Sequence, residues 1–343
     1  MPVESLQRAL HIRRKKNAHV FRNIARLWEI GEQVETHQQI LDQLHPWGDH
    51  PTLRFDNGLP KFLMLLGALS FFAMFALPSI GLPFIFGFFS SIVLLFLAFI
   101  LYETDDAIQE VVRYLEEKSI ETRYHLKFGR TPEHLPLGMS STSLINQLKN
   151  SFPLFNKGST SNQIPWYASA NISDDENHQY PAFIFQYTYI EETHIHDADG
   201  DKVTIRRTEK NQWGVFIFET RIRGLAVTNL RRDIGFPYEV RWNSSDIQIN
   251  QQLQIYGMDQ LQLVKTLNPA LLLRLSDFFK SRKGELIFHS HQNMMCFLGE
   301  ADLFEVSSKA REIQDISSLR GHLRTFRLKH YEQLCSDLST FLK

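Results

Sequence analysis

The feature that most constrains this chain is an uninterrupted run of 41 residues, 62–102, without one charged side chain. Near the middle of the run, the sequence PSIGLP at 78–83 interrupts the apolar pattern. A bilayer core about 30 Å thick is crossed by roughly 20 apolar helical residues. The run therefore predicts a transmembrane helical hairpin, with spans over about residues 58–77 and 83–102.

Basic residues flank this run on its outer sides and are absent from its middle. Arg54 and Lys61 lie close before the run, and Arg113 and Lys118 follow it, whereas residues 78–83 contain neither Lys nor Arg. In membrane proteins the short segments rich in Lys and Arg lie on the cytoplasmic side. The pattern therefore predicts that both termini are cytoplasmic.

Two segments beside the run show the periodicity of amphipathic helices. Residues 1–57 form an N-terminal cytoplasmic helical segment, and residues 103–128 form a juxtamembrane helix. In each, apolar residues recur at three- and four-residue steps, which places them on one stripe. The stripes include Val20, Ile24 and Leu27 in a helix expected over about residues 4–44, and Ile108, Val111, Val112 and Leu115 in the second helix. We expect the two stripes to pack on each other.

Helical periodicity disappears between residues 129 and 179. This stretch is rich in Ser, Asn, Pro and Gly, as in GSTSN at 158–162, a composition typical of loops. We interpret residues 129–179 as a linker. Residues 180–343, which are long enough for a hydrophobic core of their own, then form a separate cytoplasmic domain.

The domain at 180–343 shows runs of strand patterns with helices placed late. Aromatic residues alternate with other residues over 183–189, which predicts a strand. Asn268 followed by Pro269 predicts the start of a helix. Further strands are expected over 203–207, 215–220, 247–255, 285–288 and 294–298, and a last helix from Ser317. This order predicts an α+β domain, mostly an antiparallel sheet with packed helices, attached to the transmembrane hairpin and the N-terminal helical segment.

Part of this domain resembles a known family. The matching elements are INQQLQIY at 249–256, LNPAL at 267–271 and LFE at 303–305, together with Asp259 and Phe288. They are similar to those of a bacterial family of uncharacterised two-span membrane proteins that are often encoded beside LemA-type proteins. The resemblance implies two adjacent membrane spans before a cytoplasmic domain, and hence a multi-pass protein of the bacterial inner membrane. It implies no catalytic residue.

A cluster of candidate metal ligands occupies an expected hairpin tip. It contains two histidines at i, i+2 and three nearby carboxylates, namely His194, His196, Asp197, Asp199 and Asp201. Imidazole and carboxylate groups can hold a divalent cation. The spacing is not that of an EF-hand, because Lys202 and Thr208 stand where that loop has its glycine and its distant glutamate. A polar hairpin tip without metal is the alternative.

Motifs for other chemistry are absent from the sequence. The chain has no P-loop, no nucleophile elbow, no Cys-x-x-Cys and no His-Glu-x-x-His. Cys296 lies beside Met294 in an apolar strand pattern, which favours a core position. His289 and His291 form a pair without a third ligand in view, which favours a structural role. We therefore expect neither catalytic nor cofactor-binding residues.

Seven basic residues and no acidic residue lie between positions 8 and 26. Four of them are consecutive, Arg13, Arg14, Lys15 and Lys16. Such a segment can contact anionic lipid, at about 1 kcal/mol per basic residue near the surface. A solvated helix face is the alternative. We do not expect nucleic-acid binding, because no aromatic side chains alternate with these cations.

Two functional interpretations follow from these patterns. In the first, the chain is a non-enzymatic membrane-anchored protein that presents a cytoplasmic α+β interaction module to a protein partner, with envelope maintenance as the candidate process. In the second, it is an inner-leaflet enzyme or a lipid-handling protein with a pocket in the α+β domain. A concave pocket with convergent polar groups would favour the second interpretation, and an exposed apolar patch the first.

Overall fold

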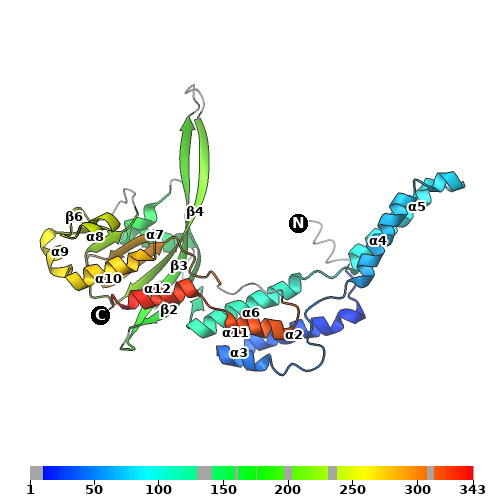
Figure 1. Ribbon diagram of the computed structural model, residues 1–343, viewed down its shortest axis with the longest axis horizontal. Helices are drawn as coiled ribbons and strands as arrows, with labels where there is room; N and C mark the ends of the chain where they lie inside the picture. The colour runs from blue at the N-terminus through cyan, green and yellow to red at the C-terminus, as the bar shows by residue number, and fades with distance from the viewer. Residues whose placement is uncertain are drawn as a thin grey trace. The chain divides into compact units, whose positions relative to one another are not determined.

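A computed structural model gives the structure of the chain (Figure 1). The chain divides into two compact units. Unit 1 comprises residues 1–123 and 308–326, and unit 2 comprises residues 124–307 and 327–343. The structure describes residues 11–129, 141–158, 161–174, 176–196, 203–230, 238–306 and 313–342.

The described part of unit 1 is helical. Its elements are η1 (Lys15–Asn17), α2 (Ala18–Gln33), α3 (His37–Gln43), α4 (Gly58–Ala73), η2 (Leu77–Ile80), α5 (Phe84–Leu101), α6 (Asp106–Tyr124) and α11 (Ile316–Thr325). The N-terminal helix differs from the expected 4–44, because the chain leaves the helix at Val34 and starts a new one after Thr36. Thr36 and Gln39 form a capping box, which satisfies the free N–H groups of that start.

The core of unit 1 forms between α2, α3, α6 and α11. Leu27 of α2, Val111 and Leu115 of α6, and Leu319 and Leu323 of α11 are all fully buried in one cluster. The expected packing of the N-terminal segment on the juxtamembrane helix is therefore confirmed.

The apolar run forms two neighbouring helices, α4 and α5. Ser70 of α4 donates a hydrogen bond to the carbonyl oxygen of Gly87 in α5 at 3.1 Å. A Cβ added at Gly67 would lie 2.9 Å from Leu95, so this glycine allows a close approach of the helices.

The lengths of these helices differ from the two equal spans that the sequence predicts. Helix α4 has 16 residues and ends at Ala73, and the short helix η2 follows it at Leu77–Ile80. Among the described residues one helical segment, Phe84–Tyr124, is long and apolar enough to cross a membrane by length and composition. Helix α4 is shorter.

The described part of unit 2 is built on a nine-stranded sheet in the order β1-β2-β3-β4-β9-β8-β5-β7-β6. All its strand pairings are antiparallel. The strands are β1 (Lys127–Phe128), β2 (Asn162–Ser173), β3 (Gln179–His196), β4 (Val203–Phe218), β5 (Leu225–Thr228), β6 (Val240–Trp242), β7 (Gln254–Gly257), β8 (Gly284–Phe288) and β9 (Met294–Gly299). The expected α+β fold with a mostly antiparallel sheet is confirmed.

Helical elements cover both faces of this sheet. They are α7 (Ser141–Ser151), η3 (Pro153–Asn156), α8 (Ile247–Gln252), α9 (Gln260–Thr266), α10 (Pro269–Lys280) and α12 (Lys329–Ser339). Phe152 and Phe155 pack on Phe216 on one face. On the other face, the ring of Phe278 in α10 contacts that of Phe297 in β9 at 5.1 Å. Side chains from both faces of the sheet are therefore buried.

The stretch 129–179 is not a linker in its described part. Helix α7, η3 and β2 lie within it, and β2 pairs with β3 along nearly its whole length. Four side chains of β2 are buried in the core, Ile164, Ala168, Ala170 and Ile172. Two of them are alanines, and the two isoleucines are eight residues apart. Because Ala and Ser are weak strand formers, the composition concealed this strand. The boundary expected at residue 180 is therefore wrong, since unit 2 begins at residue 124.

Other elements of residues 180–343 follow the expectations in part. The hairpin of β8 and β9 and the helix that starts after Asn268 are confirmed, with the Asn268 side chain accepting from the backbone N–H of Leu271. The strand patterns at 203–207 and 215–220 form one long strand, β4. Residues 247–255 form helix α8 and the start of β7 instead of a single strand. The last helix is split into α11 and α12, which belong to different units.

Candidate functional site

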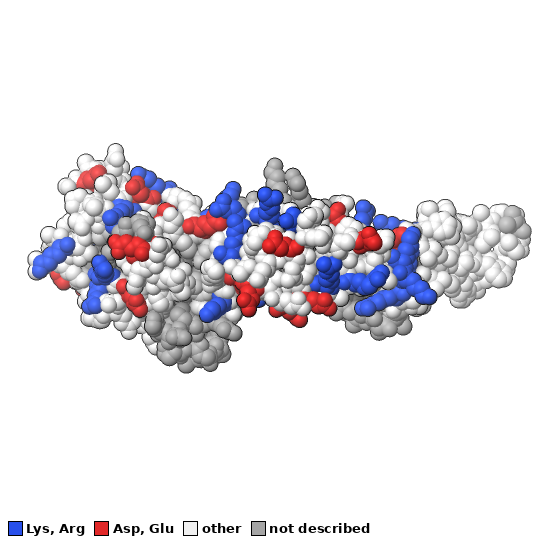
Figure 2. Space-filling model, turned by 90° about the horizontal axis from the view of Figure 1, so that it is seen from below, with Lys and Arg blue, Asp and Glu red and all other residues white. Residues whose placement is uncertain are grey.

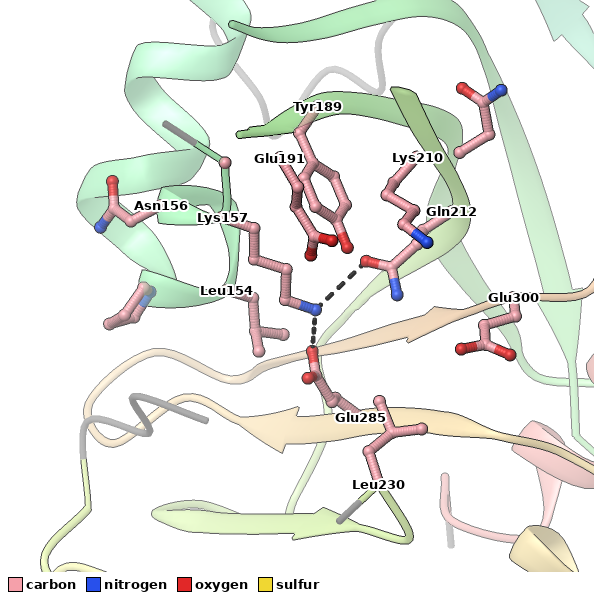
Figure 3. Close-up of a pocket in the computed structure, with 13 residues that line it drawn as sticks. Leu154, Asn156, Lys157, Tyr189, Glu191, Lys210, Gln212, Leu230, Glu285 and Glu300 are labelled. Carbon is pink, nitrogen blue, oxygen red and sulfur yellow. Dashed lines mark hydrogen bonds and ion pairs between the residues drawn. The ribbon is translucent and has the colours of Figure 1, made fainter. Parts of the chain in front are cut away.

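A pocket of about 730 Å³ lies in unit 2, and Figure 3 shows the side chains around it. It is bounded by η3 and the residues after it, by β3 and β4, and by the ends of β5, β8 and β9. Its lining consists of Pro153, Leu154, Asn156, Lys157, Gly158, Tyr189, Glu191, Lys210, Asn211, Gln212, Leu230, Glu285 and Glu300.

The segment that carries Lys157 is held in place by Tyr187 of β3. The Tyr187 hydroxyl donates to the carbonyl oxygens of Phe155 at 2.9 Å and of Lys157 at 3.2 Å. Burial raises the pKa of Tyr187 well above its usual 10.0, so the hydroxyl stays a donor. Gly158 has a φ of +81°, a conformation that glycine adopts without strain. These contacts fix where the Lys157 side chain begins.

Lys157 makes an ion pair with Glu285 at the edge of the pocket. The Lys157 Nζ donates to the Glu285 carboxylate and to Gln212 Oε1, the latter at 3.1 Å (Figure 3). Glu285 lies in the central strand β8 and is only 1% exposed, and Gln212 in β4 is also buried. A buried carboxylate is tolerated when a cation and hydrogen bonds compensate its lost hydration.

Cys296 of β9 is buried near this ion pair. Burial, followed by the charge of Glu285, raises the pKa of Cys296 well above its usual value. The thiol therefore stays protonated, and only the thiolate is a good nucleophile. The expectation that Cys296 is a core residue is confirmed.

A second group of polar contacts lies at the base of α4 and α5 in unit 1. Asp56 forms an ion pair with Lys16, and its backbone oxygen accepts from Arg14 Nη1 at 2.6 Å. The hydrogen bond from Lys16 and that from the backbone of Gly58 lower the pKa of Asp56. Thus the N-terminal segment is attached to the start of α4.

The four basic residues expected at a lipid surface have different surroundings. Arg14 and Lys16 contact Asp56, as described above. The guanidinium of Arg13 lies 4.5 Å from the centre of the Phe21 ring. Lys15 is exposed to solvent. Three of the four side chains therefore have partners within unit 1, which the sequence pattern did not indicate.

The candidate metal cluster is described only in part. His194 and His196 belong to β3, opposite Ile205 and Val203 of β4. Asp197, Asp199 and Asp201 lie outside the described residues. Within the described part of the chain, no group of three or more His, Cys, Asp or Glu side chains is arranged to hold a metal ion.

The pair His289 and His291 has a role in a turn. His289 Nδ1 accepts hydrogen bonds from the backbone N–H groups of His291, at 3.2 Å, and of Gln292, at 2.9 Å. Burial and the neighbouring His291 lower the pKa of His289, which keeps Nδ1 available as an acceptor.

The sequence analysis did not find Lys157, Gln212 or Glu285. Lys157 lies in the stretch interpreted as a linker, and 128 positions separate it from Glu285. One signal was present in the sequence: Glu285 is a charged residue in an otherwise apolar strand, GELIF at 284–288. A charge in a fully buried strand needs a partner, so this position was a candidate for a site.

The chain was compared with models of protein families, with curated proteins and with solved structures, and no match was found in any of the three. The proposals that follow are therefore based on the residues of this chain.

Proposed function

We propose that the chain is a membrane-anchored protein that presents its α+β unit in the cytoplasm. The anchor is the apolar run, with membrane segments over about residues 58–77 and 83–102. The proposed location is the bacterial inner membrane, with both termini cytoplasmic. The protein acts as a non-enzymatic interaction module, with envelope maintenance as its candidate process.

The exposure of large apolar side chains on α4 and α5 carries this proposal. Phe72, Phe84 and Phe86 are each at least 60% exposed, and many other side chains of the two helices are also open to their surroundings. Lys61, near the start of α4, is the one charged residue of these two helices, and Figure 2 shows an end of unit 1 without Lys, Arg, Asp or Glu side chains. Soluble proteins rarely expose apolar patches larger than a few hundred Å². Hydrocarbon is the environment that fits such a surface.

Cations next to these helices support the orientation. Figure 2 shows Lys and Arg side chains gathered beside the uncharged part of unit 1. Lys16, which pairs with Asp56, and Lys61 of α4 belong to this end of the helices. Basic residues next to a span favour the cytoplasmic side.

Exposed apolar side chains in unit 2 support the interaction role. Ile247, Leu261 and Val264 of α8 and α9 are each more than half exposed. Apolar patches on a soluble domain often mark protein interfaces. A photo-crosslinking residue placed at Leu261 in cells should capture a partner protein, whereas one at exposed Glu209 should not.

Reporter fusions test the anchor. Fusions after residue 55 and at the C-terminus should give cytoplasmic signals, and a fusion within residues 78–83 should give an exterior signal. A cytoplasmic signal from residues 78–83 would show that the hairpin does not cross the membrane. An exterior C-terminus would refute the proposed topology.

We also propose a second function, because the pocket of unit 2 contains a buried ion pair. Its convergent polar groups favour small-ligand binding, as in an inner-leaflet enzyme or a lipid-handling protein. A screen of small molecules by thermal shift of the full chain tests this role. Hits whose effect disappears in Lys157→Met support it, and hits that stabilise this variant equally would place the ligand elsewhere.

A further inference from the structure

The buried ion pair of Lys157 and Glu285 is in itself weak evidence for a stabilising role. Moving a carboxylate and an ammonium group out of water costs several kcal/mol for each, and an apolar pair of similar volume is often at least as stable. These two side chains line a pocket of about 730 Å³, and small-molecule sites measure roughly 300–1,000 Å³. A buried charged pair beside such a pocket marks a candidate binding site.

We propose that this pocket binds a small zwitterion, a molecule that carries both an ammonium group and a carboxylate or phosphate group. The inference is based on the ligand-binding role of unit 2 proposed above. It is independent of the membrane anchor in unit 1.

Three N–H donors converge on one part of the pocket. An ammonium group has three donors, and Lys157 uses two of them for Glu285 and Gln212. Gln212 accepts with its oxygen, so its NH₂ group remains a donor. Lys210 lies two residues before Gln212 in β4 and therefore on the same face of the strand. Figure 3 shows the Lys210 and Gln212 side chains directed toward the space next to Lys157.

Lys210 is the cation best placed for an anionic group of the ligand. It is half-buried, and it has no ion-pair partner among the residues that the structure describes. Hydrogen bonds from an ammonium group to a carboxylate or phosphate are roughly twice as strong as those between neutral groups. Lys210, with the Gln212 amide, thus provides a place for the anion.

A carboxylate on the same pocket provides a place for a cation. Glu300, which directly follows β9, lines the pocket in addition to Glu285, whose charge Lys157 compensates. A ligand with only negative charge would be repelled by Glu300, and one with only positive charge would not compensate Lys210. A ligand of both signs matches both groups.

The apolar part of the lining limits the body of the ligand. Pro153 and Leu154 of η3 and Leu230 after β5 line the pocket, and the ring of Tyr189 lies on another side. A small aliphatic body beside or between the two charged groups fits these contacts. Amino acids have this chemistry, and so does the ethanolamine phosphate headgroup of a phospholipid.

Calorimetry with matched probes tests the inference on the full chain in detergent. The probes are leucine, 4-methylpentanoate, which lacks the ammonium group, 3-methylbutylamine, which lacks the carboxylate, and phosphoethanolamine. At least one zwitterion should bind, and its binding should exceed that of each single-charge analogue by at least about tenfold, because each analogue lacks one charge-assisted hydrogen bond.

The two zwitterions distinguish the sources of the ligand. Tighter binding of leucine indicates a free amino acid. Tighter binding of phosphoethanolamine indicates a lipid headgroup, and nanodiscs of phosphatidylethanolamine should then compete with it. Nanodiscs of phosphatidylcholine should not compete, because the choline nitrogen has no N–H to donate.

Variants assign the two halves of the ligand to the two sides of the pocket. Lys210→Gln should weaken the zwitterion about tenfold and leave 3-methylbutylamine unaffected, whereas Glu300→Gln should weaken the zwitterion and leave 4-methylpentanoate unaffected. Glu209→Gln and Lys265→Gln are the matched controls, since both side chains are exposed and outside the pocket. Neither control should change binding.

Two results would overturn the inference. A single-charge analogue that binds as tightly as either zwitterion would refute it, while the broader ligand-binding role would stand. Absence of binding by both zwitterions would also refute it, and the thermal-shift screen would then decide separately whether the pocket binds any ligand.

Discussion

Asn57 and Glu103 join the outer ends of the two apolar helices through a reciprocal pair of hydrogen bonds. Asn57 Nδ2 donates to the backbone oxygen of Glu103 at 2.8 Å, and the backbone N–H of Glu103 donates to Asn57 Oδ1 at 3.1 Å. The Glu103 carboxylate also lies 2.7 Å from His11 Nε2. One side chain thus connects the residue before α4 with the segment after α5.

This relationship predicts that Asn57 stabilises unit 1. Asn57→Ala leaves the buried backbone groups of Glu103 without these partners, so we expect a loss of about 1–3 kcal/mol. Asn57→Asp keeps an acceptor and loses the donor, and its loss should be smaller. Hydrogen exchange of residues 103–106 in detergent measures the effect. Unchanged exchange in Asn57→Ala would contradict the role.

A second prediction concerns the ion pair of unit 2. Lys157→Met leaves the Glu285 carboxylate buried without its cation and should cost about 3 kcal/mol of unfolding free energy. The double variant Lys157→Met, Glu285→Leu removes both charges and should recover most of this loss. Urea unfolding of the full chain in detergent, followed by hydrogen exchange in β8, measures both. If the loss in the double variant equals the sum of the losses in Lys157→Met and in Glu285→Leu alone, the two side chains are not coupled.

The two cysteines should be unreactive in the folded protein. Burial raises the pKa of Cys296 well above its usual value and that of Cys335 to about 12. Because the thiolate is the reactive form, alkylation by iodoacetamide at about pH 8 should be more than about 100-fold slower than in the urea-unfolded chain. Peptide mass spectrometry measures each site. Fast modification of Cys296 would mean that β9 is not buried.

Some elements of the fold could be predicted from the sequence, and others could not. Local signals were sufficient for α10, because its start depends on the neighbouring residues Asn268 and Pro269. The aromatic alternation over 183–189 was sufficient for β3. Both signals arise within a few residues of chain.

Contacts between distant segments could not be predicted. β2 is specified by its pairing with β3 and not by its own residues, of which several are Ala or Ser. The partner of Glu285 depends on which loop the fold brings to β8. Likewise, the basic pattern at 13–16 shows charge but not that Arg14 and Lys16 contact Asp56. Such contacts follow from the tertiary fold alone.

A fourth prediction is a loss of stability of unit 1 in acid. Burial, and the neighbouring charge of Arg123, lower the pKa of His37 below 6.5, and Ser119 Oγ lies 2.8 Å from its Nδ1. As the pH falls below 6.5, the unfolded chain binds this proton more readily than the folded chain, so the free energy of unfolding decreases.

Hydrogen exchange of α2 and α3 at about pH 8 and about pH 5 in urea measures this effect. His37→Asn keeps a hydrogen-bonding side chain without a titrating group, and its stability should depend less on pH. Equal pH dependence of the two proteins would exclude His37 as the cause.

The last prediction separates lipid contact from structural contact in the basic segment. If Arg13 and Lys15 lie on the inner leaflet, residues 11–17 should exchange hydrogen more slowly in nanodiscs that contain anionic lipid than in neutral ones. Each basic residue near such a surface contributes about 1 kcal/mol. The protection should decrease with added salt, because the Debye length is only about 8 Å at physiological ionic strength.

Two double variants separate the contributions. Arg13→Gln with Lys15→Gln should remove the difference between the two lipids and leave the fold intact, because neither side chain contacts Asp56 and the exposed contact of Arg13 with the Phe21 ring contributes only about 0.5–1 kcal/mol. Arg14→Gln with Lys16→Gln removes the contacts to Asp56, so exchange should rise equally in both lipids. If the native protein already exchanges equally in both kinds of nanodisc, the segment does not bind lipid. Arg14 and Lys16 then serve to attach the N-terminal segment to the start of α4.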